Sequence, residues 1–338
     1  MKRSSTYLLT IIQLFQVSCQ DELLSPLNDI KISDHLLGGY FVTSIAFDSK
    51  GTAWIGTFQQ GLIKYDGSIT HFDSTNSSLP DSILIWSIAV DKGDNIWIGS
   101  NKGLIKFDRK TFVIYNKSNA PLLTDNVFAL AVDANNILWF TSCVFREGGL
   151  MKYDGTNWTL FSPQNSKMPG SLLSDIIVDI QNNVWVTVNE GVNSASIVKI
   201  TGDNLTVYGK EALGIDPYYF GNLANGYNNQ IYASIDYMLS SSFDINRPNI
   251  IGYNGSNWKV NNPVDENGKS LGYVGKITVD LMGNLWASTS ESGIVVYDGQ
   301  NWIYKKSELI IKNSVFDMTA DKYNRIWIAS GDGIYIIH

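Results

Sequence analysis

Several residue types are scarce in this sequence of 338 residues. It contains two cysteines, three histidines and eight prolines, and only 17% of its residues are charged. Two cysteines cannot build a disulfide framework, and so few histidines argue against a zinc site or a histidine-based catalytic cluster. The net charge is −7, without the clustered Lys and Arg that nucleic-acid binding requires. We therefore expect neither nucleic acid nor a metal as a partner.

A long apolar run is also missing. The mostly apolar stretch at residues 7–17 has 11 residues, whereas a membrane-spanning helix needs roughly 20. It follows a Lys-Arg pair and ends just before Cys19, which resembles a bacterial lipoprotein signal. We expect residues 1–18 to be a signal peptide, Cys19 to be the lipidated first residue, and residues 19–28 to be a tether. An ordinary secretory signal is the alternative.

Seven copies of one pattern fill the rest of the chain. In each, a turn residue precedes an aromatic residue by six positions, and successive aromatics are 41 to 54 residues apart. The aromatic positions are Trp54, Trp97, Trp139, Trp185, Tyr232, Trp286 and Trp327. The turn positions are Asp48, Asp91, Asp133, Asp179, Gly226, Asp280 and Asp321, so only the fifth copy departs at both places. Self-similarity of this kind predicts a repeat architecture.

Each copy contains four short apolar segments, separated by Asn, Asp, Gly or Ser. Such units of 40 to 50 residues predict an all-β fold, a seven-bladed β-propeller with four-stranded antiparallel blades, over residues 29–338. The last copy lacks a fourth strand. Residues 29–33 are expected to supply that outer strand and close the ring. We interpret the recurring aspartates as turn residues rather than metal ligands, and no cofactor is expected.

The pattern Asp-x-x-Gly/Asn-x-Ile/Leu-Trp, followed by Gly-Leu/Ile-x-Lys/Val-Tyr/Phe-Asp, resembles the two-component-regulator propeller repeat. In Bacteroidetes that repeat forms the periplasmic sensor of hybrid histidine kinases that respond to polysaccharide fragments. The resemblance implies the module and its compartment. For this chain, we expect a stand-alone lipoprotein-like propeller, extracytoplasmic and held at the outer membrane only by a lipid anchor.

Positions that vary between otherwise similar copies are candidates for ligand binding. Four residues before the turn position, the inner strands carry Asp175, Asn222, Lys276 and Asp317, which we expect to face the central channel. One alternative is a hydrated channel without function, in which Lys276 pairs with an acid. Another is a glycoside hydrolase or lyase, because paired carboxylates can cleave glycosides. We expect no catalytic residue.

Longer loops in the third, fourth and fifth copies give a second set of candidates, because long loops often carry function. These are Phe145, Arg146, Glu147, Glu190, Tyr218, Tyr219, Tyr237 and Arg247. Aromatic faces with a few polar groups suit sugar rings, although these aromatics would also serve to pack each loop against its own blade. The favoured function is a non-catalytic binding or sensor-like propeller for an oligosaccharide, polysaccharide or other polar ligand. A scaffold for a partner protein is a further alternative.

Overall fold

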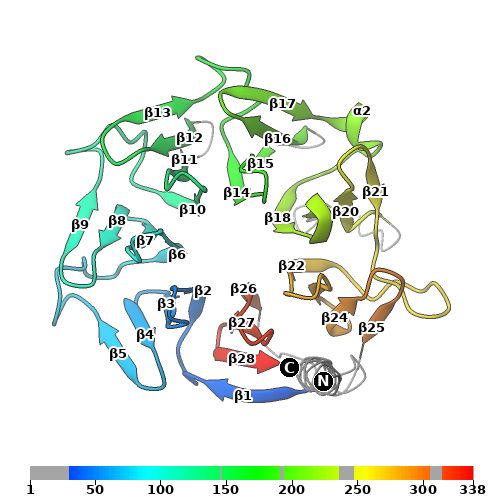
Figure 1. The fold of residues 1–338 in the computed structure, drawn as a ribbon, viewed down its shortest axis with the longest axis horizontal. Coiled ribbons are helices and arrows are strands. Elements are labelled where there is room, and N and C mark those ends of the chain that lie inside the picture. The colour runs from blue at the N-terminus through cyan, green and yellow to red at the C-terminus, as the bar shows by residue number, and fades with distance from the viewer. Residues whose placement is uncertain (1–29, 145–146, 191–193, 236–246, 305–313, 338) are drawn as a thin grey trace, which may run out of the picture.

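In the computed structural model, seven four-stranded antiparallel sheets stand radially around a central channel (Figure 1). The structure describes residues 30–144, 147–190, 194–235, 247–304 and 314–337. The predicted seven-bladed β-propeller is therefore confirmed. The predicted signal peptide, Cys19 and the tether lie outside the described residues. Among the described residues, no helix is long and apolar enough to cross a membrane.

Each blade runs from its innermost to its outermost strand. The first four blades are β2 (Val42–Phe47), β3 (Ala53–Thr57), β4 (Leu62–Tyr65) and β5 (Ile69–Phe72); β6 (Ile85–Val90), β7 (Ile96–Ser100), β8 (Gly103–Phe107) and β9 (Phe112–Tyr115); β10 (Val127–Val132), β11 (Leu138–Val144), β12 (Glu147–Tyr153) and β13 (Trp158–Phe161); β14 (Leu173–Val178), β15 (Val184–Asn189), β16 (Ala195–Thr201) and β17 (Asn204–Tyr208). The last three are β18 (Phe220–Asn225), β19 (Ile231–Ile235), β20 (Ile250–Tyr253) and β21 (Trp258–Val260); β22 (Val274–Val279), β23 (Leu285–Thr289), β24 (Gly293–Tyr297) and β25 (Trp302–Tyr304); β26 (Val315–Ala320), β27 (Ile326–Ser330), β28 (Gly333–Ile337) and β1 (Ile32–Leu36). Two short helical elements, α2 (Lys210–Leu213) and the 3-10 turn η2 (Tyr227–Asn229), complete the described fold.

The ring closes as predicted, by pairing between the two ends of the chain. The strand β1 adds antiparallel to the edge of β28, so that the seventh blade has the order β1-β28-β27-β26 (Figure 1). The strand starts three residues later than the predicted segment 29–33, at Ile32. His35 therefore lies inside this outer strand, where its ring stacks on Tyr335 with centroids 4.3 Å apart.

The repeated Asp and Trp form a buried clamp in six of the blades. In blade 2, the indole N–H of Trp97 donates to Asp91 Oδ2 at 2.9 Å. The other carboxylate oxygen accepts the backbone N–H groups of Gly93 and Asn95, which fixes the turn. The same indole bond recurs at Trp54, Trp139, Trp185, Trp286 and Trp327. The aspartates thus hold both the turn and the aromatic ring that fills the space between blades. This geometry agrees with their interpretation as turn residues.

The fifth blade has a tyrosine and a glycine in place of the Trp and Asp of this clamp. Tyr232 replaces the tryptophan, and its hydroxyl donates to Gln230 Oε1 at 3.0 Å. Gly226 replaces the aspartate, and an added Cβ there would lie 2.8 Å from the Tyr232 ring. The two departures from the pattern are therefore coupled, because the phenol ring occupies space that a side chain at position 226 would need.

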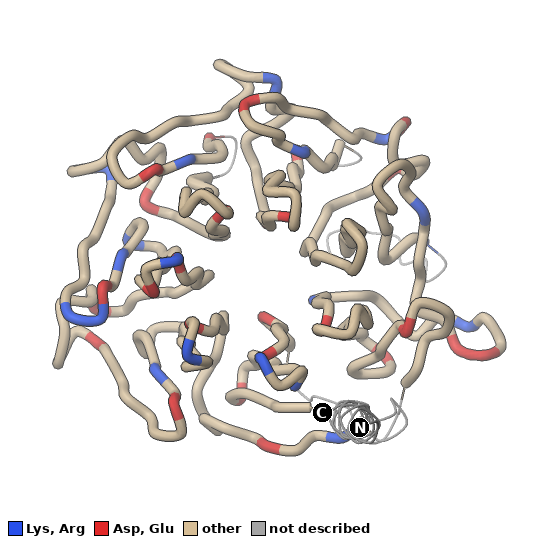
Figure 2. The backbone as a smooth tube through the Cα atoms, in the orientation of Figure 1, with Lys and Arg blue, Asp and Glu red and all other residues tan. Residues whose placement is uncertain are grey.

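The two faces of the ring differ in what they carry. Turns between the first and second strands of each blade lie on one face, called here the turn face. Loops between the second and third strands, and the connections between blades, lie on the opposite face, the loop face. Ile32 pairs with Ile337, which pairs with Ile326 at the end of the last turn, so the described chain enters the fold on the turn face. Lys and Arg are interspersed with Asp and Glu around the described part of the ring, with no continuous basic band (Figure 2).

Candidate functional site

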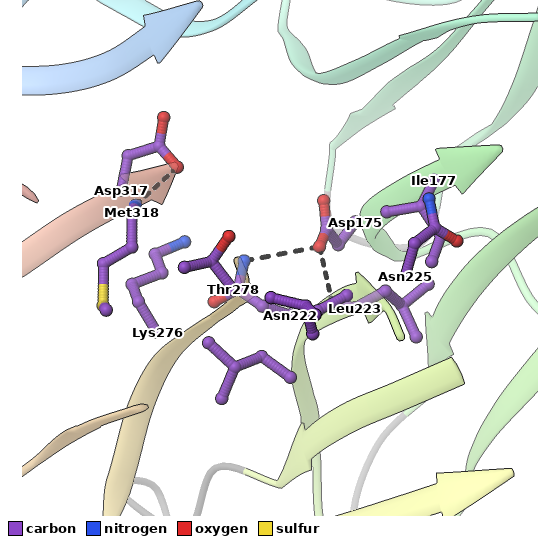
Figure 3. A pocket seen from close by; sticks show the side chains of 12 residues that line it. Asp175, Ile177, Asn222, Leu223, Asn225, Lys276, Thr278, Asp317 and Met318 are labelled. Carbon is purple, nitrogen blue, oxygen red and sulfur yellow. Dashed lines mark hydrogen bonds between the residues drawn. The ribbon is translucent and has the colours of Figure 1, made fainter. Parts of the chain in front are cut away.

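The inner strands of blades 4 to 7 surround a cavity of about 310 Å³ in the channel. Its lining contains all four predicted channel residues, Asp175, Asn222, Lys276 and Asp317 (Figure 3). Each is the third residue of its strand, on β14, β18, β22 and β26 respectively. The propeller topology thus places four side chains from four repeats around one space. From this level, the lining extends along the strands towards the turn face.

A hydroxyl group on the neighbouring strand fixes the backbone of three of these residues. The backbone N–H of Asp175 donates to Thr187 Oγ1 at 3.0 Å. Asn222 and Lys276 make the same bond to serine hydroxyls, at 2.9 and 2.8 Å. The strand ladder shifts register at this position in each of the three blades. A β-bulge of this kind re-aims a side chain, and here it sets the channel-facing position.

The Asp175 carboxylate joins two blades. Its Oδ1 accepts the N–H of Ile176 in its own strand at 2.9 Å, and its Oδ2 accepts the N–H of Leu223 in blade 5 at 2.7 Å. The Asn222 amide approaches the same Oδ2 at 3.4 Å. Both carboxylate oxygens are therefore used to satisfy backbone groups at the channel wall.

Asp317 repeats this arrangement between blades 7 and 1. Its Oδ1 accepts the N–H of Met318, and its Oδ2 accepts the N–H of Ile45, both at 2.8 Å. At the matching position of blade 1, the Ser44 hydroxyl accepts the N–H of Ile88 in blade 2 at 3.1 Å. Sequence comparison of the blades missed this inter-blade role. The signal was the recurrence of oxygen-bearing side chains at a position that otherwise varies.

Burial raises the pKa of both channel carboxyls above the ordinary aspartate value. For Asp175 the raising by burial is opposed chiefly by the charge of Lys276 and by backbone hydrogen bonds. For Asp317 it is opposed chiefly by the N–H of Ile45 and then by Lys276. The two carboxylates and the ammonium group are thus electrostatically linked across the cavity.

The ammonium group of Lys276 forms neither a hydrogen bond nor an ion pair with any residue that the structure describes. Figure 3 shows it between Asp175 and Asp317, and its charge acts on both through space. Direct pairing of Lys276 with an acid, which was one alternative for the channel, is therefore not found among the described residues. The cavity thus contains a charged donor that pairs with none of the described residues.

The two predicted glutamates of the long loops lie in different surroundings. Glu147 opens β12, at the end of the β11–β12 hairpin, and is exposed. Glu190 Oε1 accepts the backbone N–H groups of Ser171 and Leu172, the latter at 3.2 Å. The Glu190 carboxylate thus ties its loop to the connection that leads into β14. A role for either glutamate in ligand binding stays a prediction.

The remaining loop candidates are placed only in part. Tyr218 packs against the apolar cluster between blades 4 and 5. This contact agrees with the alternative that the loop aromatics pack each loop against its own blade. Tyr219 and Arg247 are half-buried, and the Arg247 carbonyl accepts the side-chain N–H of Asn262 at 3.2 Å. Phe145, Arg146 and Tyr237 lie outside the described residues. Their predicted contribution to a ligand-binding wall is therefore untested.

An arc of aromatic rings on the loop face was not predicted from the sequence. Phe316 lies 4.6 Å from Phe41, Phe41 lies 5.3 Å from Phe58, Phe58 lies 6.4 Å from Trp86, and Trp86 lies 5.7 Å from Phe128, measured between ring centroids. These five residues, the aromatic arc, extend from blade 7 through blades 1 and 2 to blade 3. Phe58 and Phe128 are 38% and 36% exposed, so the arc is open to solvent at the channel mouth.

The signal for the arc was present in the inner strands. The second residue of the strand is aromatic in three blades, at Trp86, Phe128 and Phe316. In blades 4 to 6 the same position holds Ser174, Gly221 and Gly275. The channel mouth on the loop face therefore carries bulky aromatic residues in blades 2, 3 and 7 and small residues in blades 4 to 6.

The described residues offer few groups for catalysis or metal binding. Both described histidines lie in outer strands, His35 in β1 and His71 in β5. Within the described ranges there is no group of three or more His, Cys, Asp or Glu that could hold a metal ion. Cys143 is fully buried, and burial raises the pKa of its thiol, which suits an inert core cysteine.

Three solved structures illustrate what this chain is similar to. Streptogramin B lyase matches with a TM-score of 0.69 and 15% identity, over 91% of this chain and 97% of its own. An extracellular domain assigned to the hybrid two component system BT4673 from B. thetaiotaomicron matches with a TM-score of 0.68 and 17% identity, over 90% and 39% of the two chains. PorZ, a surface component of the type-IX secretion system of Porphyromonas gingivalis, matches with a TM-score of 0.68 and 17% identity, over 88% and 46%. Identities this low show a shared fold alone.

Sequence comparison gives one specific match. Among curated protein sequences none matches this chain significantly. The family model for the two component regulator propeller matches residues 36–59, which include the first inner strand, its turn and Trp54. The predicted resemblance is thereby confirmed. The chain is a seven-bladed β-propeller whose first repeat is of the two component regulator propeller type.

Proposed function

We propose that this protein is a non-catalytic, extracytoplasmic binding propeller whose channel takes a neutral, hydroxyl-rich ligand, with a carbohydrate as the first choice. The observation that supports this most is the Lys276 ammonium group, which lies in a cavity of about 310 Å³ without a hydrogen-bond partner among the described residues. Unused donors at a polar cavity wall are what a ligand would satisfy.

The charges of the cavity favour a neutral ligand. An anion would meet the carboxylates of Asp175 and Asp317, and a cation would meet Lys276. A hydroxyl group both donates and accepts hydrogen bonds. It can therefore accept from the ammonium group and donate to a remaining lone pair of a carboxylate. Several hydroxyls on one ring would satisfy several of these groups together.

The loop face supports this ligand class in a second way. The aromatic arc supplies apolar ring surface beside the channel mouth, and blades 4 to 6 carry the small residues Ser174, Gly221 and Gly275 at the same level. The C–H faces of sugar rings pack on such surfaces, while their hydroxyls seek polar partners. Recognition at the loop face would also involve the long loops of blades 3 to 5, where the sequence predicts further binding residues.

A glycoside hydrolase or lyase is the weaker candidate. The carboxylates that it would use, Asp175 and Asp317, each accept two backbone N–H groups, which supports a structural role for them. The similarity to streptogramin B lyase concerns the fold. A scaffold that binds only a partner protein is the second alternative.

The location outside the cytoplasm is part of the proposal. It is supported by the signal-like N-terminus of the sequence and by the extracellular assignment of the similar domain from B. thetaiotaomicron. We further propose that Cys19 carries a lipid that holds the propeller at the outer membrane. Mass spectrometry of the protein from detergent-extracted membranes would test this, because an unmodified Cys19 would contradict the lipid anchor.

Calorimetric titration with a panel of neutral and acidic oligosaccharides tests the ligand class. Lys276→Met removes the ammonium group but keeps most of the side-chain volume, and it should weaken binding about 10- to 100-fold, since a hydrogen bond from a charged group contributes about 1.5–3 kcal/mol. The control is Lys259→Met, on the exposed outer strand β21. Equal affinity of both variants and the wild type would contradict the channel site.

The same panel separates the alternatives. Product release from a bound oligosaccharide, abolished by Asp175→Asn, would support the enzyme instead. Absence of binding to every oligosaccharide, with capture of a membrane protein that survives Lys276→Met, would support the scaffold.

A further inference from the structure

The turn face of blades 4 to 7 carries large apolar side chains in contact with solvent. They are Ile180, Tyr227, Leu281, Met282 and Tyr323, exposed by 79%, 64%, 63%, 46% and 66%. Each occupies one of the two positions that directly follow the turn residue at the start of its turn. We call these five residues the tip patch. Together they exceed the scattered single apolar residues that are normal on a protein surface.

The turn itself does not require apolar residues at these positions. The turns of blades 1 to 3 have Ser49, Lys92 and Ala134 after the aspartate, and they use the same aspartate bonds to the backbone. The conformation depends on the aspartate and on a later residue with positive φ, such as Asn182 in blade 4. The apolar tips are therefore additional to what the fold needs, and they occur in four successive blades.

Contacts between blades hold the tips of blades 5, 6 and 7 in one surface. An added Cβ at Gly283 of blade 6 would lie 3.0 Å from the Cβ of Tyr227, so the blade 5 tip lies directly against the blade 6 turn. The backbone N–H of Leu281 donates to Asn324 Oδ1 of blade 7 at 2.7 Å. The tips of blades 5, 6 and 7 are thus linked, and their side chains project from a braced backbone.

The described chain begins beside this surface. Ile30 is 4% exposed and packs with Trp286 and Ile337 in the apolar cluster between blades 6 and 7. The next strand begins at Ile32 on the turn face. Whatever precedes residue 30, including the predicted lipidation site at Cys19, therefore connects to the propeller on the side that carries the tip patch.

We propose that the tip patch docks the propeller onto a lipid bilayer surface. Leucine, isoleucine and methionine side chains would enter the outer part of the acyl region, and tyrosines would lie at the level of the headgroups, where aromatic residues are enriched. Lys322 lies over the Tyr323 ring, 5.2 Å from its centroid, and brings positive charge to the same surface. Arg325 lies over the same ring at 5.4 Å, and its charge is paired with the Asp321 carboxylate at 2.7 Å. That combination of apolar and cationic groups suits a bilayer that contains anionic lipid.

Docking in this orientation has a consequence for the channel. The loop face, with the aromatic arc at its channel mouth, would point away from the lipid and stay exposed to soluble ligands. Bilayer binding does not depend on the ligand, so it can be tested separately from the proposed function.

Vesicle sedimentation tests the proposal with the chain from Gln20 onward, which retains every described residue and lacks Cys19. The probe is vesicles of phosphatidylcholine with one quarter phosphatidylglycerol. The wild type should sediment with them, and the triple variant Ile180→Ser, Leu281→Ser, Met282→Ser should bind at least about 10-fold more weakly, because each removed side chain contributes buried apolar area. These side chains are exposed, so the variant should keep its fold, and circular dichroism checks this.

A control variant removes three exposed apolar residues from the outer rim. Ile69, Val113 and Val207 are 58%, 44% and 39% exposed, on the outer strands β5, β9 and β17. Their triple serine variant should bind vesicles like the wild type. Equal losses in both variants, or no binding by the wild type, would overturn the proposal. Reduced self-association of the tip variant without lipid, at unchanged vesicle binding, would show a protein interface instead.

A site-specific probe gives the orientation. The chain from Gln20 onward lacks Cys19, and Cys143 is buried, so a cysteine introduced on its surface can be labelled alone. A polarity-sensitive fluorophore on Met282→Cys should shift to shorter wavelength with vesicles, and the same label on Val113→Cys should not. Lys276→Met should leave this shift unchanged while it weakens ligand binding. A shift at both labels or at neither would contradict docking through the tips.

Discussion

Removal of one clamp aspartate gives a direct measure of what holds the blades together. In blade 2 the carboxylate of Asp91 accepts the N–H groups of Gly93 and Asn95 at 2.8 and 2.9 Å, and the indole N–H of Trp97 at 2.9 Å. Asp91→Ala removes all of these acceptors at once. After the change, the backbone N–H groups of Gly93 and Asn95 can form hydrogen bonds with water, because these residues are not buried. The indole N–H of Trp97 cannot, because Trp97 is only 5% exposed.

The magnitude follows from these bonds. A hydrogen bond to a charged acceptor contributes about 1.5–3 kcal/mol, and a buried donor without a partner costs about 1–3 kcal/mol. We expect Asp91→Ala to lower the free energy of unfolding by about 4 kcal/mol. Trp97→Phe keeps most of the ring but removes the donor, and should lower it by about 2 kcal/mol. The double variant should lose about 4 kcal/mol, so the coupling between the two side chains is about 2 kcal/mol.

Urea unfolding provides the assay. Far-ultraviolet circular dichroism and tryptophan fluorescence are followed together, and coincident curves allow conversion to a free energy. The control is Asp154→Ala, in the exposed hairpin of blade 3, where the carboxylate accepts turn N–H groups but no indole. Its effect should be the smaller one. Additive losses for Asp91→Ala and Trp97→Phe, with coupling within about 0.5 kcal/mol of zero, would refute the clamp.

Three further predictions concern the channel, the core and a strand start. In the wild type, the Asp317 carboxylate accepts the backbone N–H groups of Met318 and Ile45. Asp317→Asn places an amide N–H against one of these N–H groups, and should destabilise the fold by about 1–3 kcal/mol. Burial raises the folded pKa of Asp317 above 3.8, so the wild type gains stability as it takes up a proton. The difference in free energy of unfolding between wild type and this variant should therefore grow as the pH falls from neutral towards 3.8. A difference in urea unfolding that stays constant with pH would contradict this. Cys143 should react with a thiol reagent only at the rate of unfolding, and rapid labelling of the folded protein would disprove its burial. Gly103→Ala should cost more than about 2 kcal/mol in urea unfolding, because φ is +112° and the new Cβ would lie 2.1 Å from the Tyr115 carbonyl oxygen; an unchanged midpoint would refute the strain.

The blade architecture was predictable from the sequence because its determinants are local. Asp91 and Trp97 are six residues apart, and the turn and two strands between and around them depend on that short segment. Seven repetitions of a local pattern leave few arrangements other than a closed ring. The boundary of β1 was predicted three residues too early, since a strand that completes a distant blade takes its register from β28 and not from its own sequence.

The channel residues were predictable in position but not in their contacts. Counting back from the turn aspartate located Asp175, Lys276 and Asp317 correctly on the channel wall. Their hydrogen bonds join residues 48 and 272 positions apart, from Asp175 to Leu223 and from Asp317 to Ile45. Such contacts depend on the packing of neighbouring blades around the ring.

The sequence by itself determined the repeat, the fold class and which positions are free to vary, because turn chemistry and apolar alternation act over a few residues. Only the tertiary structure decided what the varying positions do. In the structure, the carboxylates of Asp175 and Asp317 form hydrogen bonds between blades, and Lys276 has no partner among the described residues. Five aromatic rings from four blades form one arc. The apolar turns of blades 4 to 7 lie on the face where the described chain begins. These features depend on contacts between blades, which bring together side chains that are distant in the sequence.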